Sequence, residues 1–200
     1  MKILITGVAG FIGSRLAEFL IQKNYKVYGV DNLWKGEIKN IPKKVNFIEG
    51  DVGEKKTIEQ IKNIGHIDII CHLAGQSSGE KSFYDPNLDL KLNLSSMLGV
   101  IEIAKFSSVK KIINASSMSV YGEVKSAASE ENDAPNPISI YGQNKLSSEK
   151  YFSILLPNIP VINFRMFNVY GPGQCFNDLK QGMVSIFLAM AINKNEIEIK

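Results

Sequence analysis

The stretch ITGVAGFIGSRLAEFL, at residues 5–20, constrains the fold more than any other part of the chain. It joins a short apolar run to an amphipathic helical pattern and places Gly7, Gly10 and Gly13 at three-residue spacing. Gly7 permits a tight turn, Gly10 lets a pyrophosphate approach the backbone, and Gly13 lets the helix pack closely on the strand. A flexible glycine loop is the alternative interpretation, but the flanking strand and helix favour a phosphate-binding turn.

Short apolar runs alternate with longer helical patterns along the chain. The runs predict strands over residues 2–6, 26–31, 45–51, 67–74, 110–116 and 160–165. The longer patterns predict helices over residues 11–23, 54–63, 84–107, 139–156 and 179–194. In the first helix we expect a buried face made of Phe11, Ile12, Leu16, Phe19 and Leu20. The alternation predicts an α/β fold with a doubly wound parallel sheet, in which ligands bind at the carboxyl ends of the strands.

Charge and composition argue against several classes of protein. The net charge of +3 comes from 23 basic and 20 acidic residues with no basic run, which is not typical of a nucleic-acid-binding surface. The apolar stretches are shorter than the roughly 20 residues of a membrane helix, and the N-terminal run is too short for a signal peptide. Cys71 and Cys175 lack the spacing of a metal site. We therefore expect buried free thiols in a cytoplasmic protein, no metal and no membrane.

Two aspartates end predicted strands. Asp31 follows Gly13 by 18 residues, which matches the acidic residue that accepts hydrogen bonds from an adenosine ribose. A carboxylate there repels a 2′-phosphate, so NAD is favoured over NADP; a solvated aspartate at a strand end is the alternative. Asp51 closes the third strand and could bind the adenine amino group, although aspartates are common in turns.

A serine and a Tyr–Lys pair follow the fifth predicted strand. Ser117 lies at its end, and Tyr141 comes 24 residues later, four residues before Lys145 on one helix face. The pair alone could be a surface accident, but the glycine turn and the serine favour a catalytic set. Oxidation of an alcohol needs a base, and a partly desolvated ammonium at Lys145, aided by the positive nicotinamide, would lower the pKa of Tyr141 from about 10. Ser117 would hold the reacting oxygen by a hydrogen bond.

Seven short segments follow one another along the chain in this order: TGVAGFIG, VDNL, GDV, HLAG, SSMSVYG, YGQNK and FRMFNVYGPGQ. On these segments the chain resembles, over all 200 residues, the extended short-chain dehydrogenases/reductases of the NAD-dependent epimerase/dehydratase family. The resemblance implies a Rossmann fold, NAD as cofactor and a nucleotide-sugar substrate. The chain departs from the family pattern at Met166, where tyrosine is common, and at Ser96 and Met97, where Gly-Thr is common.

The same resemblance implies roles for individual residues. The catalytic residues would be Ser117, Tyr141 and Lys145, and the last two would also contact the cofactor. Ser117 and Asn168 would contact the sugar nucleotide, whereas Ser116 and Ser119 would support the strand end and its turn. The remaining cofactor contacts would come from the pyrophosphate turn, the ribose and adenine sites, and the loop along the far half of the cofactor: Gly7, Gly10, Phe11, Ile12, Gly13, Asp31, Asn32, Asp51, Val52, Leu73, Ala74 and Gly75.

The residues between Ser117 and Val120 bear on the reaction. Dehydratases of the family carry an acid and a glutamate base where this chain has Met118 and Ser119, and neither of these can shuttle a proton. The SSMSVYG pattern is similar to that of epimerases, so we expect epimerisation, at C4 of a UDP-sugar. The alternatives are a nucleotide-sugar reductase or dehydratase of the same family, or an inactive NAD-binding fragment.

The length of the chain bears on its domain organisation, and the pattern of one helix bears on its assembly. We expect an NAD-binding domain with the catalytic residues over 1–170 and only the beginning of a substrate-binding region over 171–200, because family members are usually at least half as long again. The predicted helix 84–107 is apolar on more than one face, which indicates that a second surface covers it. The resemblance implies a homodimer that forms through helices 84–107 and 139–156.

Overall fold

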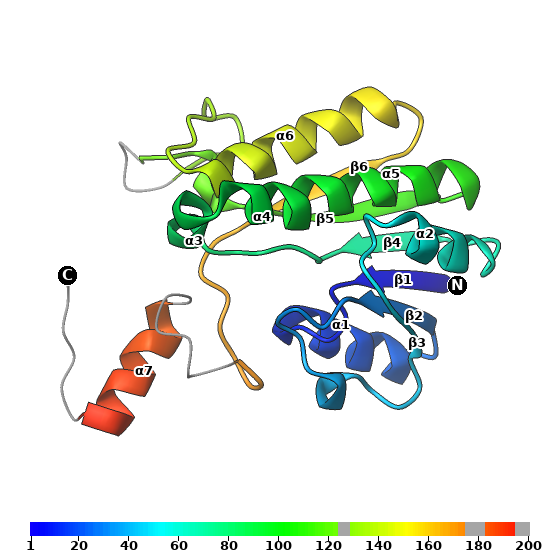
Figure 1. The fold of residues 1–200 in the computed structure, drawn as a ribbon, viewed down its shortest axis with the longest axis horizontal. Coiled ribbons are helices and arrows are strands. Elements are labelled where there is room, and N and C mark those ends of the chain that lie inside the picture. Colours follow the sequence, from blue (N-terminus) through cyan, green and yellow to red (C-terminus); the bar gives the residue numbers. More distant parts are fainter. Residues whose placement is uncertain (124–128, 175–182, 195–200) are drawn as a thin grey trace.

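The computed structural model describes residues 1–123, 129–174 and 183–194. Within them six parallel strands form one sheet in the order β3-β2-β1-β4-β5-β6 (Figure 1). The strands are β1 (Lys2–Thr6), β2 (Lys26–Asp31), β3 (Asn46–Glu49), β4 (Ile69–His72), β5 (Lys111–Ser117) and β6 (Val161–Met166). The strand order reverses beside β1, which is the topological switch point at which such sheets bind ligands. The predicted doubly wound parallel sheet is confirmed.

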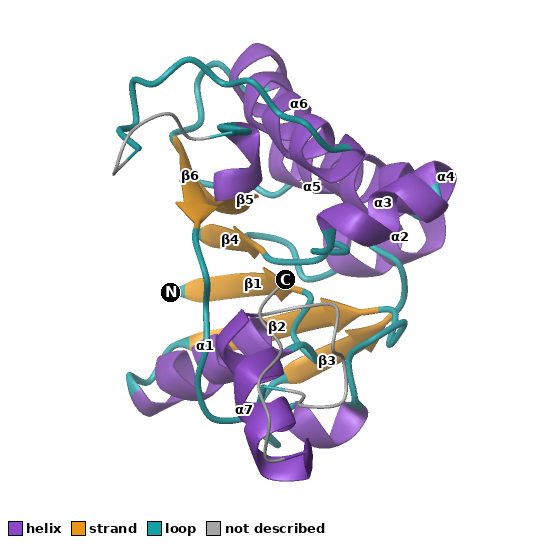
Figure 2. Cartoon of the chain, turned by 90° about the vertical axis from the view of Figure 1, so that its left-hand side faces the viewer, coloured by secondary structure: helices purple, strands orange, loops and turns teal. Residues whose placement is uncertain are grey.

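Helices cover the two faces of the sheet unequally (Figure 2). Helix α1 (Phe11–Gln22) packs on one face against β1 and β2. Helices α2 (Lys55–Lys62), α5 (Ser96–Phe106) and α6 (Ile140–Leu155) cover the other face. Parallel strands that are covered on both faces have sequences made almost entirely of apolar residues. In β1, for example, Leu4 faces the larger core under α2, α5 and α6, whereas Ile3 and Ile5 face α1.

The predicted helix 84–107 is found as a helical segment that runs without a gap from residue 86 to residue 106. It consists of α4 (Pro86–Leu90), a π-helical turn (Lys91–Ser95) and α5. Pro86 occupies the first turn of α4, and the Asp85 side chain caps it by accepting from Leu88 N at 2.9 Å. The short helix α3 (Gly79–Tyr84), capped by Ser78, was not predicted. The interruption at Asp85 between α3 and α4 is a local cap that helical periodicity does not show.

The buried face of α1 differs from the expectation. Phe19 is 53% exposed, and Lys23 Nζ lies 5.6 Å from the centroid of its ring. The fully buried residues of the helix are the small Gly13, Ser14 and Ala17, and Leu16 and Leu20 pack against the same core as expected. A Cβ at position 13 would overlap the carbonyl oxygen of Gly7. Small residues therefore let α1 approach the strand end closely, and Phe19, two residues after the buried Ala17, lies on the opposite side of the helix.

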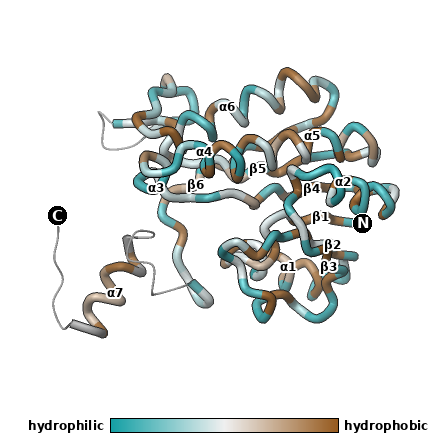
Figure 3. The backbone as a smooth tube through the Cα atoms, in the orientation of Figure 1, coloured by the Kyte–Doolittle hydropathy of each residue, from teal (hydrophilic) through white to brown (hydrophobic). Residues whose placement is uncertain are grey.

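The end of the described chain is the helix α7 (Met183–Lys194), which lies apart from the sheet in Figure 1 and is largely hydrophobic in Figure 3. The predicted helix 179–194 is thus found from residue 183 onward; residues 179–182 and Cys175 lie outside the described residues. Among the described residues, no helix combines the length and apolar character needed to cross a membrane. Cys71 is a buried free thiol, and burial raises its pKa to about 11.

Candidate active site

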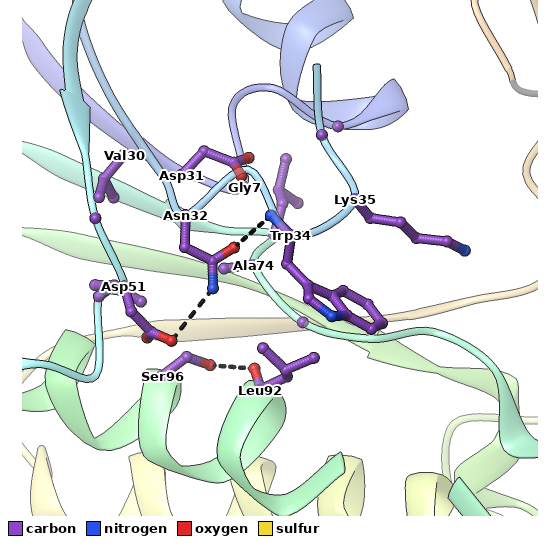
Figure 4. A pocket seen from close by; sticks show the side chains of 16 residues that line it. Gly7, Val30, Asp31, Asn32, Trp34, Lys35, Asp51, Ala74, Leu92 and Ser96 are labelled. Atoms are coloured by element: carbon purple, nitrogen blue, oxygen red, sulfur yellow. Dashed lines mark hydrogen bonds between the residues drawn. The ribbon is translucent and has the colours of Figure 1, made fainter. Parts of the chain in front are cut away.

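A hollow lies at the carboxyl edge of the sheet, over the switch point (Figure 4). Its lining includes nine of the predicted cofactor residues: Gly7, Gly10, Asp31, Asn32, Asp51, Val52, Leu73, Ala74 and Gly75. It also includes Ser96, one of the departures from the family pattern, and residues that were not singled out from the sequence: Val30, Trp34, Lys35, Gly36, Gly50 and Leu92. The predicted residues come from the ends of β1, β2, β3 and β4, which the parallel topology brings to one edge.

The glycine turn forms the floor of this hollow. Gly7 has φ +74°, and a Cβ there would come within 2.8 Å of Ala74 N. Gly10 is the N-cap residue of α1, which has no side-chain cap and no acidic residue in its first turn. The first N–H groups and the positive end of the helix dipole are therefore left for an anion. These features fit the pyrophosphate of a dinucleotide.

Phe11, Ile12 and Gly13 take a different position from the two lining glycines. Gly13 packs against Gly7, as described above. Phe11 and Ile12 line a neighbouring hollow, together with Arg15, Leu16 and the segment 169–172 that follows β6. Their side chains thus face away from the main hollow, and only their backbone belongs to the helix N-terminus.

Asp31 connects the glycine turn to the end of β2. Its Oδ2 accepts from Ala9 N at 2.9 Å and its Oδ1 from Leu33 N at 2.8 Å. Burial raises the pKa of Asp31, and these two hydrogen bonds oppose the shift. Each carboxylate oxygen can accept more than one hydrogen bond, so the group retains capacity for ribose hydroxyls.

Asn32 and Asp51 are joined across the hollow (Figure 4). Asn32 Nδ2 donates to Asp51 Oδ2 at 3.2 Å, and the other carboxylate oxygen accepts from Gly53 N at 2.9 Å. Asn32 Oδ1 accepts from Trp34 N at 3.0 Å, and Trp34 is 45% exposed. The Trp34 ring therefore gives the hollow an aromatic wall that can contact a planar base.

Ser117 and Tyr141 meet next to this hollow. Ser117 ends β5, and its Oγ accepts from Ser119 N at 3.1 Å and lies 3.2 Å from Ser119 Oγ. Tyr141 is in the first turn of α6, which Ser139 caps by accepting from Gly142 N at 3.0 Å. A hydrogen bond joins the Ser117 and Tyr141 side chains. The strand end and the helix cap thus place a hydroxyl and a phenol together.

Lys145 lies one turn further along α6, with Nζ 5.7 Å from the centroid of the Tyr141 ring. Burial lowers the pKa of Lys145 to about 8. Burial also raises the pKa of Tyr141, while the hydrogen bond from Ser117 opposes that shift. In the chain without NAD, desolvation of the phenolate therefore prevails, and the expected lowering of the Tyr141 pKa by Lys145 together with the positive nicotinamide stays a prediction.

The loop of residues 73–75 links this group to the hollow. Gly75 has φ +150°, and a Cβ there would lie 3.5 Å from Lys145 Nζ. Thr6 Oγ1 accepts from Leu73 N at 3.2 Å and from Ala74 N at 3.1 Å. Its single hydrogen is then available for His72 Nδ1, which lies 2.8 Å away. Burial lowers the pKa of His72 to about 3, so a neutral histidine fixes the loop.

The remaining predicted residues lie beyond the ends of β5 and β6. Asn168 is exposed in the segment that follows β6. Ser116 Oγ donates to Glu149 Oε1 at 2.5 Å, and Arg165 donates to both oxygens of Glu149 at 3.1 and 2.8 Å. Ser116 therefore fastens β5 to α6, and Ser119 contacts Ser117 in the following turn.

Four buried polar residues beside Lys145 were not identified from the sequence: Gln76, Asp89, Asn93 and Asn144. They form one hydrogen-bonded group that joins the loop after β4, α4, the π-helical turn and α6. One signal was available, because Asp89 and Asn93 are four residues apart in a helical pattern. Burial of their shared face depends on α6, and residue spacing alone does not show that.

Comparisons with known proteins agree with this geometry. The model of a family described as "NAD dependent epimerase/dehydratase family" matches residues 3–200. A UDP-glucose 4-epimerase of Mycolicibacterium smegmatis is 31% identical over 195 residues, which are 94% of this chain and 62% of that protein.

The chain is also similar to solved structures of epimerases. A UDP-glucose 4-epimerase of Thermotoga maritima, solved with UDP-glucose, is 34% identical with a TM-score of 0.93; the match covers 100% of this chain and 65% of that one. A UDP-glucose 4-epimerase of Thermus thermophilus, solved with NAD, is 34% identical with a TM-score of 0.87, and that match covers 96% of this chain and 61% of the other. The chain thus spans a little over three fifths of the length of these relatives.

Proposed function

The chain belongs to the NAD dependent epimerase/dehydratase family, and on that premise we propose that it forms the cofactor-binding and catalytic part of a nucleotide-sugar epimerase that inverts C4 of a UDP-sugar. The observation that carries this proposal is the grouping of Ser117, Tyr141 and Lys145 beside the hollow at the carboxyl edge. The similar 4-epimerases supply the substrate class. Residues 1–170 would be the NAD-binding domain, and 171–200 the start of a substrate-binding region.

The residues of the hollow fit NAD. The N-terminus of α1 with Gly7 and Gly10 would hold the pyrophosphate, and Asp31 would accept from the adenosine ribose. Asp51 and Trp34 would flank the adenine, while Leu73 to Gly75 and Lys145 would hold the other half. When bound, NAD supplies a reversible acceptor for the hydride of the sugar carbon and a positive charge near the phenol.

Tyr141 acts in this proposal as the base and then as the acid. Its phenolate takes the proton of the C4 hydroxyl, and the same group returns a proton after the keto-sugar has presented its other face. Ser117 donates a hydrogen bond to the reacting oxygen and fixes its distance from Tyr141. The Lys145 ammonium stabilises the phenolate across the 5.7 Å that separates Nζ from the ring centroid.

Met118 and Ser119 favour epimerisation over dehydration. Elimination of water needs a proton donor and a base near the sugar, and Met118 has neither. The Ser119 hydroxyl lies 3.2 Å from Ser117 Oγ and has no carboxyl group to offer. Apart from NAD as the hydride acceptor, epimerisation needs only groups that move the hydroxyl proton, and the three side chains can supply these.

Assembly and location are part of the same proposal. Helices α5 and α6 expose large apolar side chains: Leu98 at 49%, Phe106 at 70%, Tyr151 at 43% and Ile154 at 69%. We assign these faces to a homodimer contact with a second copy of the chain. We also place the enzyme in the cytoplasm, where the free thiol of Cys71 would stay reduced.

The test is an assay of UDP-glucose and UDP-galactose interconversion by NMR. It is made with this chain and with a chimera that adds the C-terminal part of the Thermotoga maritima relative. We expect interconversion in the chimera with no net change in NADH. Stoichiometric consumption of NADH would show a reductase instead, and release of a 4-keto-6-deoxy sugar would show a dehydratase. Binding of NAD without turnover of either sugar by the chimera would contradict the proposed activity.

A further inference from the structure

Asp89 is a buried carboxylate that the proposed mechanism does not use. It lies on α4 and is 1% exposed. Its Oδ1 accepts from Gln76 Nε2 at 2.5 Å and from Asn93 Nδ2 at 3.2 Å, and its Oδ2 accepts from Asn144 Nδ2 at 2.7 Å. Within the described residues it forms no ion pair at 4.0 Å or less. A buried carboxylate without a direct cation is costly, and these three amide donors stabilise it.

The carboxylate determines how the three amides are oriented. Each amide turns its NH₂ group toward Asp89, so the oxygen of Asn93 faces the other way. A Cβ on Gly75 would lie 2.5 Å from Asn93 Oδ1 and 3.5 Å from Lys145 Nζ. Asn93 Oδ1 is buried and has no hydrogen-bond partner among the described residues. The amide group therefore presents an unused acceptor in the space that Lys145 also borders.

Lys145 is linked to Asp89 through its neighbour in the chain. Asn144 directly precedes Lys145 on α6, and its 2.7 Å hydrogen bond to Asp89 fastens that turn of α6 to α4. Gln76 directly follows Gly75, the residue of the loop after β4 that borders Lys145 Nζ. Two of the three partners of Asp89 are thus adjacent in sequence to Lys145 or to the glycine beside its ammonium.

We propose that Asp89 is a positioning residue of the catalytic site, whose carboxylate keeps the Lys145 ammonium charged and holds it beside Tyr141 through the amides of Gln76, Asn93 and Asn144. The role in catalysis rests on the proposed function, whereas the electrostatic coupling between Asp89 and Lys145 does not. The inference stands on the shared burial of the two charges and on the three hydrogen bonds of 2.5–3.2 Å.

The sign of the coupling follows from the charge of the carboxylate. Burial lowers the pKa of Lys145, and the Asp89 carboxylate opposes that shift. Burial is the main reason why the pKa of Tyr141 is raised, and the same carboxylate adds to the rise. Replacing Asp89 by a neutral residue should therefore lower both pKa values, which is the response to loss of one anion and not to loosened packing.

Other charged groups on the elements around α6 differ from Asp89. His72 on β4 interacts with Lys145, but its pKa of about 3 keeps it neutral at physiological pH. Arg165 on β6 is already bound to Glu149 of α6. The remaining groups on α3 and α4 are on exposed or half-buried side chains: Glu80, Lys81, Tyr84 and Asp85. Asp89 is the anion that acts on Lys145.

The experiment is an NMR titration of the chain labelled with ¹³C at the ε carbon of lysine. The Lys145 resonance, assigned with Lys145→Arg, reports the midpoint at which the ammonium loses its proton. We expect a lower midpoint in Asp89→Asn and a midpoint close to the original in Asp89→Glu, which keeps the charge. Asp68→Asn is the matched control, because it removes another buried aspartate, which lies at the amino edge of the sheet, opposite to Lys145. An unchanged midpoint in a folded Asp89→Asn would overturn the proposal.

A second measurement needs no substitution at Asp89. In the unaltered chain labelled with ¹³C at the aspartate carboxyl carbon, the Asp89 resonance should show an inflection at the midpoint of Lys145, because coupling is reciprocal. An Asp89 carboxyl that is protonated at neutral pH would contradict the inference even if Asp89→Asn fails to fold.

The activity of the chimera then separates the two proposals. Both limbs of its pH–rate profile should move to lower pH in Asp89→Asn. An inactive chimera with a coupled Asp89–Lys145 pair would refute the proposed function alone. An active chimera in which the charge of Asp89 has no effect on the pKa of Lys145 would refute the role of Asp89 alone.

Discussion

Tyr141 and Lys145 are both buried, and burial acts on them in opposite directions. It favours the neutral phenol at Tyr141, whose pKa is raised, and the neutral amine at Lys145, whose pKa falls to about 8. The Lys145 Nζ lies 5.7 Å from the centroid of the Tyr141 ring, so a phenolate and an ammonium stabilise each other. Each group therefore becomes charged more easily when the other is charged. The proposed base is thus formed most easily when a positive charge lies close to the phenol.

Replacement of Tyr141 by phenylalanine tests this proposed role. Tyr141→Phe removes the atom that would take the substrate proton but preserves the ring under Lys145. We expect kcat of the active chimera to fall by about 10³-fold, with NAD affinity nearly unchanged. Ser117→Ala should be milder, at about 10²-fold, because it removes one positioned hydrogen bond. Turnover and calorimetric NAD binding are the measurements, and normal turnover by Tyr141→Phe would exclude the mechanism.

We expect Asp31 to determine the preference of the chain for NAD over NADP. Its carboxylate is held at the end of β2 by Ala9 N and Leu33 N and would meet a 2′-phosphate with like charge. We expect the chain to bind NAD at least about tenfold more tightly than NADP, which is about 1.4 kcal/mol. Asp31→Ala should narrow this ratio mainly by improving NADP binding. Titration calorimetry with both dinucleotides measures the ratio, and equal affinities in the unaltered chain would contradict the expectation.

At the level of elements, the amino ends of three strands are joined by one carboxylate. Asp68 precedes β4 and accepts from Lys2 N at 2.8 Å in β1, from Lys110 Nζ at 2.7 Å before β5, and contacts His66 Nε2 at 3.0 Å. The hydrogen bond from Lys110 is the main reason why the pKa of Asp68 lies well below its usual range. This contact lies at the edge opposite to the proposed site.

The depressed pKa of Asp68 predicts a pH-dependent stability. A carboxyl group whose pKa is lower in the folded chain stabilises it above the unfolded value, about 4, and this contribution disappears as the pH falls toward the folded value. Asp68→Asn should therefore lower the free energy of unfolding at pH 7, and the difference should shrink below about pH 4. Urea unfolding at several pH values measures it. A difference that stays constant down to the lowest pH would show that charge is not responsible.

The contact of α1 with the sheet depends on Gly13. Because a Cβ there would overlap the Gly7 carbonyl oxygen, Gly13→Ala should displace α1 and its N-terminus. We expect a loss of about 1–3 kcal/mol in the free energy of unfolding and weaker NAD binding. Gly65→Ala is the control, because Gly65 has φ +74° but nothing within 4 Å of the added Cβ. It should lower stability through backbone strain and leave NAD affinity unchanged; equal loss of affinity in both variants would argue against a packing effect at Gly13.

In the whole molecule, the two faces of the sheet differ in how far they are covered. Helices α2, α5 and α6 pack over β3, β4, β5 and β6, whereas α1 covers β1 and β2 on the other side (Figure 2). In β6, Ile162 and Phe164 point to the side of α1 and are 41% and 50% exposed. The described residues thus leave two apolar surfaces, one on this sheet face and one on α5 and α6.

The proposed homodimer assigns a partner to the second of these surfaces. We expect light scattering at micromolar concentration to give twice the mass of one chain. Ile154→Glu on α6 should convert the dimer to a monomer, because it would bury a charge in the contact. Phe164→Glu is the control on the opposite side of the sheet and should leave the mass unchanged. A monomeric unaltered chain, or dissociation caused by Phe164→Glu alone, would contradict a contact through α5 and α6.

Local sequence determined the strand–helix order and the positions of Gly7, Asp31 and Ser117 at the carboxyl edge. Turn chemistry and hydrophobic period are properties of neighbouring residues, and the parallel topology then brings strand ends together. The one-turn spacing of Tyr141 and Lys145 was likewise readable, because a helix places residues four apart on one face.

Tertiary structure alone decided which side chains share an environment. Phe19 is exposed because it lies on the side of α1 opposite to Ala17, and the contact of Gly13 and Ala17 with the sheet decided which side is buried. The pKa of Tyr141 is raised mainly by burial, and residue spacing does not show how deeply a side chain is buried. Asp89 lies near Lys145 only because α4 and α6 pack together, and burial by distant elements is what gives its charge an effect.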